Sequence, residues 1–536
     1  MTAQFYQTDP VRAEAAPAPR PIVWAIGGSD SGGGAGIQAD LLTLTDLGCH
    51  ACTLITAVTA QNSHQVSLVS PVDSQTLWAQ LTALSTDLPP RVVKIGQIPA
   101  PAQAEVLLQW LADHKHKLGF TVIWDPVLAA TAGQQLSALS RPLCLQLLTW
   151  VDILTPNWHE LAMLTACSEA RLSQLIAALT NSSTLLPSLT ELLPTFNGHL
   201  LLKGGHAPTA GPTVQDLLLS CLPQQREGWQ IQAPRLQTKH QHGTGCTLAS
   251  ALAAALARGY ALTDALIVAR AYLQQGLRLS YATGQGPGVL GRAGWPTQPA
   301  DFPSLLPLPQ PQAVAARPPL LFAKLTHPLG LYPVVDDIQW LKRLLPLGLH
   351  TIQLRLKNLS QAELQRQISQ AVAFCRDFDI QLFINDHWQL AIEYQAFGVH
   401  LGQEDLASAD LAAIAAAGLR LGISTHGYAE LCQVLALQPS YLALGHIFPT
   451  NTKQMPSKPQ GIARLAQYVR LCDKTPTVAI GGIQLADIPH LLATGVQGIA
   501  VVSAITKAAE PEKALLQLKQ ACQRGLAFTG EPYANH

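Results

Sequence analysis

The sequence has few charged residues, few aromatic residues and no excess of either charge. Charged residues make up 13% of its 536 residues, and 34 basic residues balance 34 acidic ones. A neutral chain gives no reason to expect binding to nucleic acid or to a membrane surface. No segment reaches the roughly 18 uninterrupted apolar residues of a membrane-spanning helix. The stretch from Met1 to Arg20 carries acidic residues and prolines before any apolar run, so we expect neither a signal peptide nor an anchor.

Cysteine spacing offers no framework for disulfides or zinc. The ten cysteines are scattered, and in a chain of this length they are typical of reduced thiols in a cytoplasmic protein. Cys49 and Cys52 form a C-x-x-C pair, but no second pair exists to complete a zinc site. Buried cysteines of a strand are the favoured interpretation.

The sequence is long and hydrophobic, and one proline-rich segment interrupts it. Its 536 residues exceed the usual size of a single core, and its 48% hydrophobic content excludes disorder throughout. Prolines crowd the stretch from Pro296 to Pro319, which predicts an extended, semi-rigid linker. Strands alternate with helical patterns on both sides, so we predict two α/β domains. The predicted organisation is a disordered tail over 1–20, a first domain over 21–295, a linker over 296–328, a second domain over 329–523 and a C-terminal tail over 524–536.

Polar residues follow the short apolar strands of the first domain, where an open parallel sheet binds its ligands. The predicted strands are Ile22–Ile26, Leu54–Val58, Val92–Ile95, Val122–Trp124, Ile153–Leu154 and Leu200–Leu202. The first strand runs into the glycine-rich segment Gly27–Gly36. Glycines let a backbone approach a ligand closely, although such a segment is equally typical of a tight turn.

A second glycine segment, His242–Thr247, precedes a predicted helix over Leu248–Ala257. Amides at a helix N-terminus, with the helix dipole behind them, hold phosphate. The same field lowers the pKa of a thiol placed there. We therefore expect Cys246 to assist at a transferring phosphoryl group, and the alternative is a buried cysteine at the start of a helix.

Five motifs of the first domain occur in a fixed order over about Pro21 to Trp295: G-S-D-S-G-G-G-A-G-I-Q-A-D, T-A-V-T-A-Q-N, L-T-P-N-x-x-E, L-K-G-G-H and H-G-T-G-C-T. They resemble the hydroxymethylpyrimidine/phosphomethylpyrimidine kinase family, whose fold is a ribokinase-like αβα sandwich. The resemblance implies ATP as co-substrate and Mg²⁺ bridging its phosphate oxygens. It also implies a pyrimidine site at Gly28, Asp40 and Gln61, magnesium and nucleotide-phosphate contacts at Asn157, Glu160, Lys203 and Thr244, an anion hole at Gly243 and Gly245, and Cys246 at the attacked hydroxyl.

Two positions depart from the family pattern. Gln97 stands where the family usually has methionine, and Thr131-Ala132-Gly133 stands where it commonly has Lys-Ser-Gly. These departures motivate one alternative, a catalytically weak or regulatory pyrimidine-binding domain. A second alternative is a general sugar kinase joined to an unrelated phosphate-binding barrel. Cys246 in place of the usual Asp, together with Asp40 and Gln61, argues against it.

Eight short apolar runs in the second domain predict a (β/α)8 TIM barrel, in which chemistry lies at the carboxyl ends of the strands. The runs are Leu331–Val335, Thr351–Leu354, Leu382–Ile384, Gly398–Leu401, Leu421–Ser424, Tyr441–Leu444, Thr477–Ile480 and Gly498–Val502.

The ends of these runs carry anion-binding and metal-binding side chains. Gln353, Arg355 and Lys357 follow period-two spacing, so they share one face that suits a diphosphate; a solvated strand face is the alternative. Asp386 and Asp405 end neighbouring strands, where two carboxylates suit Mg²⁺ with substrate phosphate oxygens.

The motifs G-L-Y-P-V-V-D, Q-L-R-x-K, I-N-D, G-V-H-L-G-Q-E-D, G-x-S-T-H, F-P-T-x-T-K, A-I-G-G-I and V-V-S-A-I occur in order. They resemble thiamine-phosphate synthase from about Leu329 to Gln523. The resemblance implies that hydroxymethylpyrimidine diphosphate loses diphosphate and that the nitrogen of thiazole phosphate attacks the resulting cation. It implies a diphosphate site at Gln353, Arg355, Lys357, Asn385 and Lys453, with Arg355 and Lys453 catalytic, a pyrimidine contact at Ser424, and thiazole-phosphate contacts at Thr450, Thr452, Gly482 and Ser503.

Four histidines near the same strand ends, His387, His400, His426 and His446, lack the spacing of metal ligands, and we interpret them as loop or supporting groups. The sequence therefore predicts a cytoplasmic fusion of two enzymes of thiamine biosynthesis that act on small molecules. It leaves open whether the protein forms a homo-oligomer.

Overall fold

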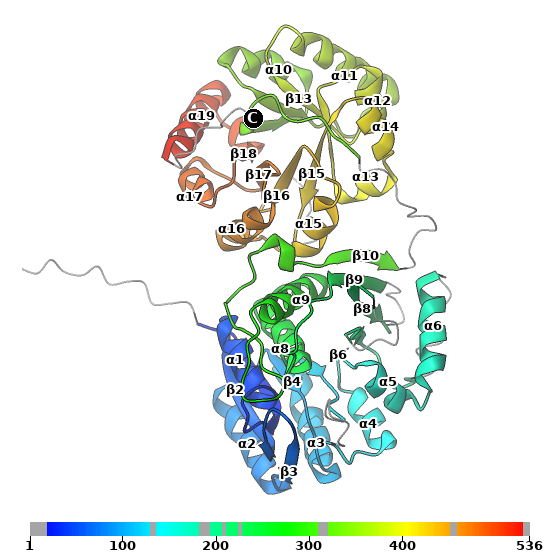
Figure 1. Cartoon of the computed structure of the whole chain (residues 1–536). Helices are drawn as coiled ribbons and strands as arrows, with labels where there is room; N and C mark the ends of the chain where they lie inside the picture. Colours follow the sequence, from blue (N-terminus) through cyan, green and yellow to red (C-terminus); the bar gives the residue numbers. More distant parts are fainter. Residues whose placement is uncertain are drawn as a thin grey trace, which may run out of the picture.

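A computed structural model describes residues 19–128, 136–181, 193–205, 211–222, 228–308, 320–450 and 458–528. The chain forms two α/β units that are stacked end to end (Figure 1). The first unit is a ten-stranded sheet in the order β10-β9-β8-β7-β6-β5-β4-β1-β2-β3, and the second is a closed barrel of β11 to β18. Both predicted fold classes are confirmed.

The strands of the first unit are β1 (Ile22–Ser29), β2 (His50–Gln61), β3 (Val66–Pro71), β4 (Val92–Ile95), β5 (Thr121–Trp124), β6 (Ile153–Leu154), β7 (His199–Leu202), β8 (Thr213–Ser220), β9 (Gly228–Pro234) and β10 (Ser304–Leu308). Its helices are α1 (Gly36–Asp46), α2 (Ser74–Asp87), α3 (Pro101–Leu118), α4 (Arg141–Leu148), α5 (Trp158–Thr165), α6 (Glu169–Asn181), α8 (Thr244–Ala257) and α9 (Leu262–Arg278), with the 3-10 turn η1 (Pro299–Asp301). The six predicted strands are all present as β1, β2, β4, β5, β6 and β7.

The central strands of this sheet are parallel, and antiparallel strands extend both edges. Helices cover the two faces with separate apolar layers: buried residues of α1, α8 and α9 lie on one face, and those of α2 to α5 on the other. The parallel strands therefore point their carboxyl ends to one edge, at which polar side chains gather.

The barrel strands are β11 (Gly330–Val335), β12 (Thr351–Leu354), β13 (Gln381–Asn385), β14 (Gly398–Leu401), β15 (Arg420–Thr425), β16 (Tyr441–Gly445), β17 (Thr477–Ile480) and β18 (Gly498–Val501). The helices around them are α10 (Ile338–Leu344), α11 (Gln361–Cys375), α12 (Trp388–Glu393), α13 (Gln403–Ser408), α14 (Leu411–Ala416), α15 (Tyr428–Leu435), α16 (Gly461–Leu471), α17 (Ile488–Leu492), α18 (Ser503–Thr506) and α19 (Pro511–Phe528), with 3-10 turns η2 (Leu345–Leu347) and η3 (Leu485–Asp487). Each of the eight predicted strands has its counterpart, because each is a short apolar run that ends in polar residues.

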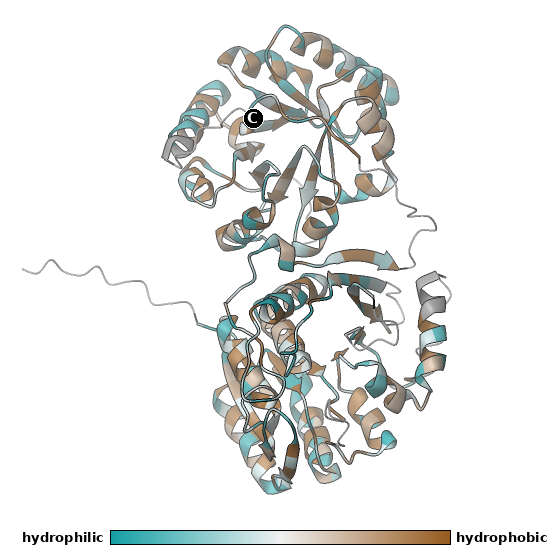
Figure 2. Cartoon of the chain, in the orientation of Figure 1, coloured by the Kyte–Doolittle hydropathy of each residue, from teal (hydrophilic) through white to brown (hydrophobic). Residues whose placement is uncertain are grey.

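The two units share one continuous hydrophobic core. Part of the segment expected as a linker, Ser304–Leu308, forms β10 and pairs with β9 at the edge of the first sheet. Figure 2 shows hydrophobic residues on β10, where it lies between the sheet and the barrel. The buried cluster that contains α8 and α9 continues into the barrel helices.

Among the described helices, none combines the length and apolarity needed to cross a bilayer.

Candidate active sites

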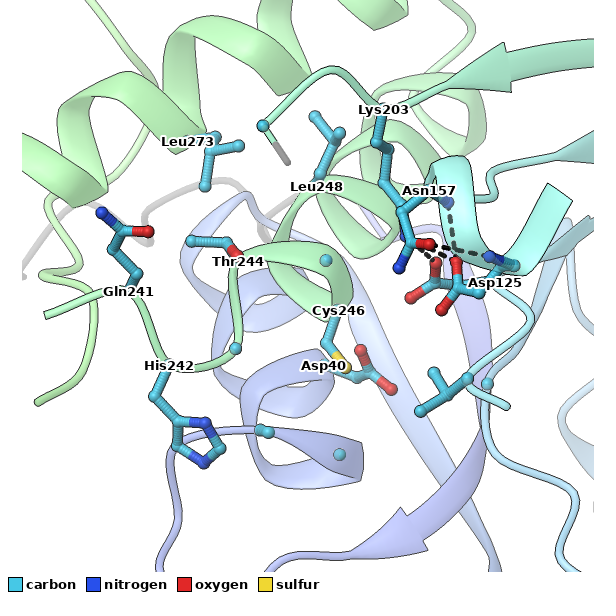
Figure 3. Close-up of a pocket in the computed structure, with 18 of the residues that line it drawn as sticks. Asp40, Asp125, Asn157, Lys203, Gln241, His242, Thr244, Cys246, Leu248 and Leu273 are labelled. Carbon is cyan, nitrogen blue, oxygen red and sulfur yellow. Dashed lines mark hydrogen bonds and ion pairs between the residues drawn. The ribbon is translucent and has the colours of Figure 1, made fainter. Parts of the chain in front are cut away.

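A cavity of about 930 Å³ lies at the carboxyl edge of the first sheet, and Figure 3 shows part of its lining. Two glycine segments meet there. Gly243 has a φ of +79°, and a Cβ on it would lie 2.0 Å from the carbonyl oxygen of Gly34. Only glycine therefore fits at position 243, and this contact joins the loop after β1 to the start of α8. Gly28, Asp40, Gln61, Asn157, Glu160, Lys203, Gly243, Thr244, Gly245 and Cys246 all line the cavity.

Asp30 organises the loop after β1. Its carboxylate accepts hydrogen bonds from the amides of Gly32, Gly34 and Ala35 at 2.8, 3.1 and 2.8 Å. His242 Nε2 lies 3.1 Å from Asp30 Oδ2 and 3.3 Å from Gln61 Nε2. Burial alone would raise the pKa of Asp30, but hydrogen bonds from His242 and the loop amides hold it below its usual value. Asp30 and His242 were not predicted as site residues, although both stand inside the quoted motifs.

Asp40 and Lys94 form a buried ion pair under the cavity. Lys94 Nζ lies 2.8 Å from Asp40 Oδ2, and neither side chain is more than 1% exposed. Ser250 Oγ donates to Asp40 Oδ1 at 2.7 Å. Burial alone would lower the pKa of Lys94, but the carboxylate of Asp40 raises it above its ordinary value. Lys94 was not predicted as a site residue, although a single charged residue inside the apolar strand β4 could have indicated it.

Cys246 lies in the first turn of α8 beside Asp40 (Figure 3). The prediction that the helix field lowers the pKa of this thiol is wrong. The pKa of Cys246 is raised to about 11: burial is the main cause, Lys94 offsets it in part, and Asp40 and Asp125 add to it. Two nearby carboxylates and the loss of water therefore outweigh the helix dipole, and the sulfur is a neutral thiol at pH 7.

Asp125, Glu160 and Lys203 form a charged cluster beside the start of α8. Lys203 Nζ lies 2.6 Å from Asp125 Oδ1 and 3.7 Å from Glu160 Oε2. Burial raises the pKa of Glu160, whereas Lys203 overcomes the effect of burial on Asp125 and holds its pKa below the usual value. A Cβ on Gly245 would lie 3.4 Å from Lys203 Nζ. The helix amides and the ammonium thus converge on one place, as an anion site requires.

Asn157 and Glu160 have a local structural role in addition to their place in the lining. They form the capping box of α5: Glu160 N donates to Asn157 Oδ1 at 2.9 Å, and Asn157 N donates to Glu160 Oε2 at 2.7 Å. This box fixes the carboxylate of Glu160 next to Lys203. Asp125, which completes the cluster, is a further site residue that was not predicted.

The glutamine that replaces the family's methionine fits the fold. Gln97 Nε2 donates to the carbonyl oxygen of Leu136 at 2.9 Å. A Cβ on Gly28 would lie 2.1 Å from Gln97 Oε1, so the glycine leaves room for the amide. The other departure, Thr131-Ala132-Gly133, lies outside the described residues.

At the carboxyl rim of the barrel, Lys357, Asp386 and Asp405 converge. Lys357 Nζ forms an ion pair with Asp386 Oδ2, and the carboxyl groups of Asp386 and Asp405 interact electrostatically. Burial and the neighbouring Asp386 raise the pKa of Asp405. Asp386 also has a φ of +64°, a strained conformation for a non-glycine residue that is typical of functional sites.

Arg355 lies in the same rim. It is half-buried directly after β12, whereas Lys357 is exposed and Gln353 is 4% exposed. The guanidinium of Arg355 makes no ion pair with any other residue that the structure describes. Burial of these three residues therefore decreases from the barrel core to its surface, and Arg355 and Lys357 lie beyond the end of β12 at Leu354.

A hydrogen-bond relay crosses the barrel interior and ends at Ser424. Gln353 Nε2 donates to the Tyr332 hydroxyl at 3.2 Å, and the hydroxyls of Tyr332 and Tyr441 are 2.7 Å apart. His400 Nδ1 lies 2.7 Å from the Tyr441 hydroxyl, and His400 Nε2 lies 2.8 Å from Ser424 Oγ. His400 is therefore a supporting group for Ser424, as its interpretation from sequence proposed.

The loops after β16 and β17 approach one another at the same rim. Gly482, after β17, has a φ of +67°, and a Cβ there would lie 2.5 Å from the carbonyl oxygen of Pro449. Its contact places the β17 loop against Pro449 and the neighbouring Thr450. Ser503 opens α18 directly after β18, and Asn385 is the last residue of β13. Thr452 and Lys453 lie outside the described residues.

A group of possible metal ligands, His327, His350 and Asp379, lies elsewhere. Their ligand atoms lie within 4.8 Å of one another. They precede β11, β12 and β13, so they occupy the end of the barrel opposite to Asp386 and Asp405.

Comparisons with known proteins agree with this division of the chain. Residues 30–291 match the family described as phosphomethylpyrimidine kinase, and residues 331–505 match thiamine monophosphate synthase. Thiamine-phosphate synthase of Salmonella schwarzengrund (strain CVM19633) is 59% identical over 190 residues, which are 35% of this chain and 90% of that protein. The Escherichia coli O1:K1 / APEC enzyme of the same name is 58% identical over 190 residues, with 35% and 90% covered.

Among solved structures, a phosphomethylpyrimidine kinase from Clostridium difficile 630 is 28% identical, with 47% of this chain and 98% of that chain covered and a TM-score of 0.38. The chain belongs to the thiamine-phosphate synthase family through its barrel, and it carries a phosphomethylpyrimidine kinase domain on the N-terminal side of that barrel.

Proposed function

We propose that the two domains catalyse consecutive steps of thiamine biosynthesis. The kinase domain transfers the γ-phosphoryl group of ATP to hydroxymethylpyrimidine and then to its phosphate. The barrel condenses the diphosphate product with thiazole phosphate, forming thiamine phosphate and releasing diphosphate. The kinase and synthase families supply the reaction types, and the arrangement of the residues supports the assignment of the steps.

In the kinase domain, the support comes from the convergence of Lys203, the first amides of α8 and Cys246 on one cavity. The α8 amides and Lys203 would neutralise charge on the transferred phosphoryl group. Cys246 is protonated at neutral pH, so it would act as a neutral hydrogen-bond donor beside the reacting oxygen. Asp40 is already paired with Lys94 and Ser250. Its role is therefore to form a rigid polar floor, on which Gln61 and Gly28 complete the pyrimidine site.

In the barrel, the main support comes from Lys357, Asp386 and Asp405, which converge at the rim where Arg355 follows β12. Two carboxyl groups this close would repel as anions, and a proton or a cation must lie between them. Oxygen ligands next to a diphosphate suit Mg²⁺, which takes one or two carboxylates and completes its shell with phosphate oxygens and water. Asp386 and Asp405 would hold this ion, which supplies charge neutralisation of the leaving diphosphate.

The chemistry of the barrel then requires leaving-group stabilisation and alignment. Arg355 and Lys357 would hold the diphosphate as its bond to the pyrimidine methylene carbon breaks. Ser424, held by His400, would fix the pyrimidine ring, while the loops of Gly482 and Ser503 would hold the thiazole phosphate. The ring nitrogen of the thiazole then bonds to the methylene carbon.

A two-arm assay on the intact protein tests the proposal. One arm contains hydroxymethylpyrimidine, ATP, thiazole phosphate and Mg²⁺, and the other supplies the pyrimidine diphosphate in place of the first two. We expect thiamine phosphate in both arms. Product in the second arm alone would favour a weak or regulatory N-terminal domain, which Gln97 and Thr131 motivate; no product in either arm would refute the synthase assignment. The cytoplasmic location stays a prediction.

A further inference from the structure

The first turn of barrel helix α15 is capped by a residue of the kinase domain. The N-cap position of α15 is Gly427, which has no side chain to accept a hydrogen bond from the helix amides. Asp264 Oδ1, in the first turn of α9, accepts a hydrogen bond from the amide of Ala429 at 2.8 Å. Asp264 thus supplies to α15 what an N-cap aspartate supplies within its own helix.

Gly427 leaves room for the carboxylate of Asp264 because it has no side chain. Its φ of −174° is extended backbone that any residue can adopt. A Cβ on Gly427, however, would lie 2.2 Å from Asp264 Oδ2 and 2.8 Å from its Cγ. The absence of a side chain at position 427 is therefore explained by the approach of Asp264 and not by the local backbone.

The surrounding contact between the domains is buried and aromatic. Tyr428 is fully buried, stacks on Phe302, and its hydroxyl accepts a hydrogen bond from Trp295 Nε1 at 2.8 Å. The guanidinium of Arg464 lies 3.9 Å from the ring centre of Tyr260. A contact of this kind holds the start of α15 firmly against the kinase domain.

The capped turn lies directly after the predicted pyrimidine contact. Ser424 is near the end of β15, and only Thr425, His426 and Gly427 separate it from α15. The same loop is braced from the barrel side, because Glu430 Oε2 accepts a hydrogen bond from the amide of His426 at 2.8 Å. The loop is therefore fixed at one end by His400 and at the other by Asp264.

We propose that Asp264 of the kinase domain is a positioning residue for the synthase reaction, because it holds the β15–α15 loop and with it Ser424. This inference rests on the proposed function of the barrel. Asp264 does not line the kinase cavity, so its removal should affect the synthase and leave the kinase unchanged.

The test uses the full chain with the pyrimidine diphosphate supplied to the synthase and, separately, with hydroxymethylpyrimidine and ATP supplied to the kinase. Asp264→Ala should raise the KM for the diphosphate about fivefold to tenfold, as expected for a lost N-cap, with kcat and kinase turnover within about twofold of the wild type. Asp264→Asn retains an acceptor oxygen and should restore most of the loss. Gly427→Ala should mimic Asp264→Ala, and the double variant should be no worse than either single variant.

Tyr260→Phe is the matched control. It removes the 2.8 Å hydrogen bond to Gln467 at the same contact but leaves the α15 cap intact, so its KM should stay at the wild-type value. An unchanged KM in Asp264→Ala and Asp264→Asn, an equal rise in Tyr260→Phe, or a parallel loss of both activities would overturn the inference. A wild-type protein that makes no thiamine phosphate from the diphosphate would instead refute the proposed function.

Discussion

The hydroxyl of Ser424 lies 2.8 Å from Nε2 of His400, and this contact is the outer end of a relay that runs through Tyr441 and Tyr332 to Gln353. The relay joins side chains of five barrel strands, so no single motif contains it. Its inner members are buried and its outer member faces the rim. Its geometry links the packing of the barrel core to the orientation of a predicted substrate contact.

Removal of the central hydroxyl should therefore affect both stability and substrate binding. Tyr441→Phe removes the hydrogen bonds that the Tyr441 hydroxyl makes with Tyr332 and His400, and loss of a hydrogen bond to a buried group costs about 1–3 kcal/mol. We expect a lower unfolding midpoint in urea and a higher KM for the pyrimidine diphosphate. Tyr468→Phe removes another buried tyrosine hydroxyl, bonded to Gln460 at 2.9 Å outside the relay, and should leave the KM unchanged. Equal KM values in both variants would show that the relay does not orient Ser424.

Removing one charge of the buried Asp40–Lys94 pair should strongly destabilise the folded protein. Asp40→Asn leaves the ammonium of Lys94 without its counterion, which costs about 3–5 kcal/mol when a buried pair is broken. Adding Lys94→Met should recover much of this stability. The comparison is Asp152→Asn, at an ion pair with Lys115 in which the aspartate is 41% exposed; its effect should be within about 1 kcal/mol. Urea unfolding followed by tryptophan fluorescence measures these differences, and similar losses at both pairs would contradict the account.

The raised pKa of Cys246 predicts slow alkylation at neutral pH. Because its pKa is raised to about 11, the thiol stays neutral through pH 7, and the reactive thiolate grows about tenfold per pH unit below the pKa. The rate of iodoacetamide labelling at Cys246, followed by mass spectrometry with Cys246→Ser as the control for peptide assignment, should rise steadily from pH 7 to pH 10. A rate that levels off near pH 7 would show a thiolate and restore the original expectation.

Asp386 and Asp405 should determine how synthase turnover depends on Mg²⁺. Loss of groups that only support a metal ligand costs about 10–100-fold in affinity, so Asp405→Asn should raise the Mg²⁺ concentration needed for half-maximal synthase turnover by at least about tenfold. Glu404→Gln changes the adjacent acid, which we do not assign to the metal, and should leave the Mg²⁺ titration unchanged. A titration that shifts equally in both variants would remove Asp405 from the ligand set.

The sequence predicts the strands well where a short apolar run ends in polar residues, as in all eight barrel strands. It missed β10 because Pro307 and its neighbouring prolines favour a linker. β10 lies at the edge of the sheet and pairs only with β9. An edge strand tolerates a proline, which donates no hydrogen bond, because one side of the strand has no partner strand. Site residues inside recognisable motifs were also found, whereas Lys94 and Asp125 were missed as members of the site.

Two other features depend on contacts that local sequence does not encode. The pKa of Cys246 is set by burial and by Asp40 and Asp125, which come from distant segments and oppose the helix dipole. The role of Asp264 depends on how α9 packs against α15. Neither is visible until the chain is folded.

The most direct test of the two-step account is an Arg355→Ala variant of the full chain, supplied with hydroxymethylpyrimidine, ATP, thiazole phosphate and Mg²⁺. Arg355 stands at the barrel rim, and loss of one group that stabilises developing charge costs about 100-fold or more in turnover. Mass spectrometry should show the pyrimidine diphosphate accumulating with little thiamine phosphate, while the wild type converts it fully. A variant that forms thiamine phosphate at the wild-type rate, or a wild type that never forms the diphosphate, would contradict the account.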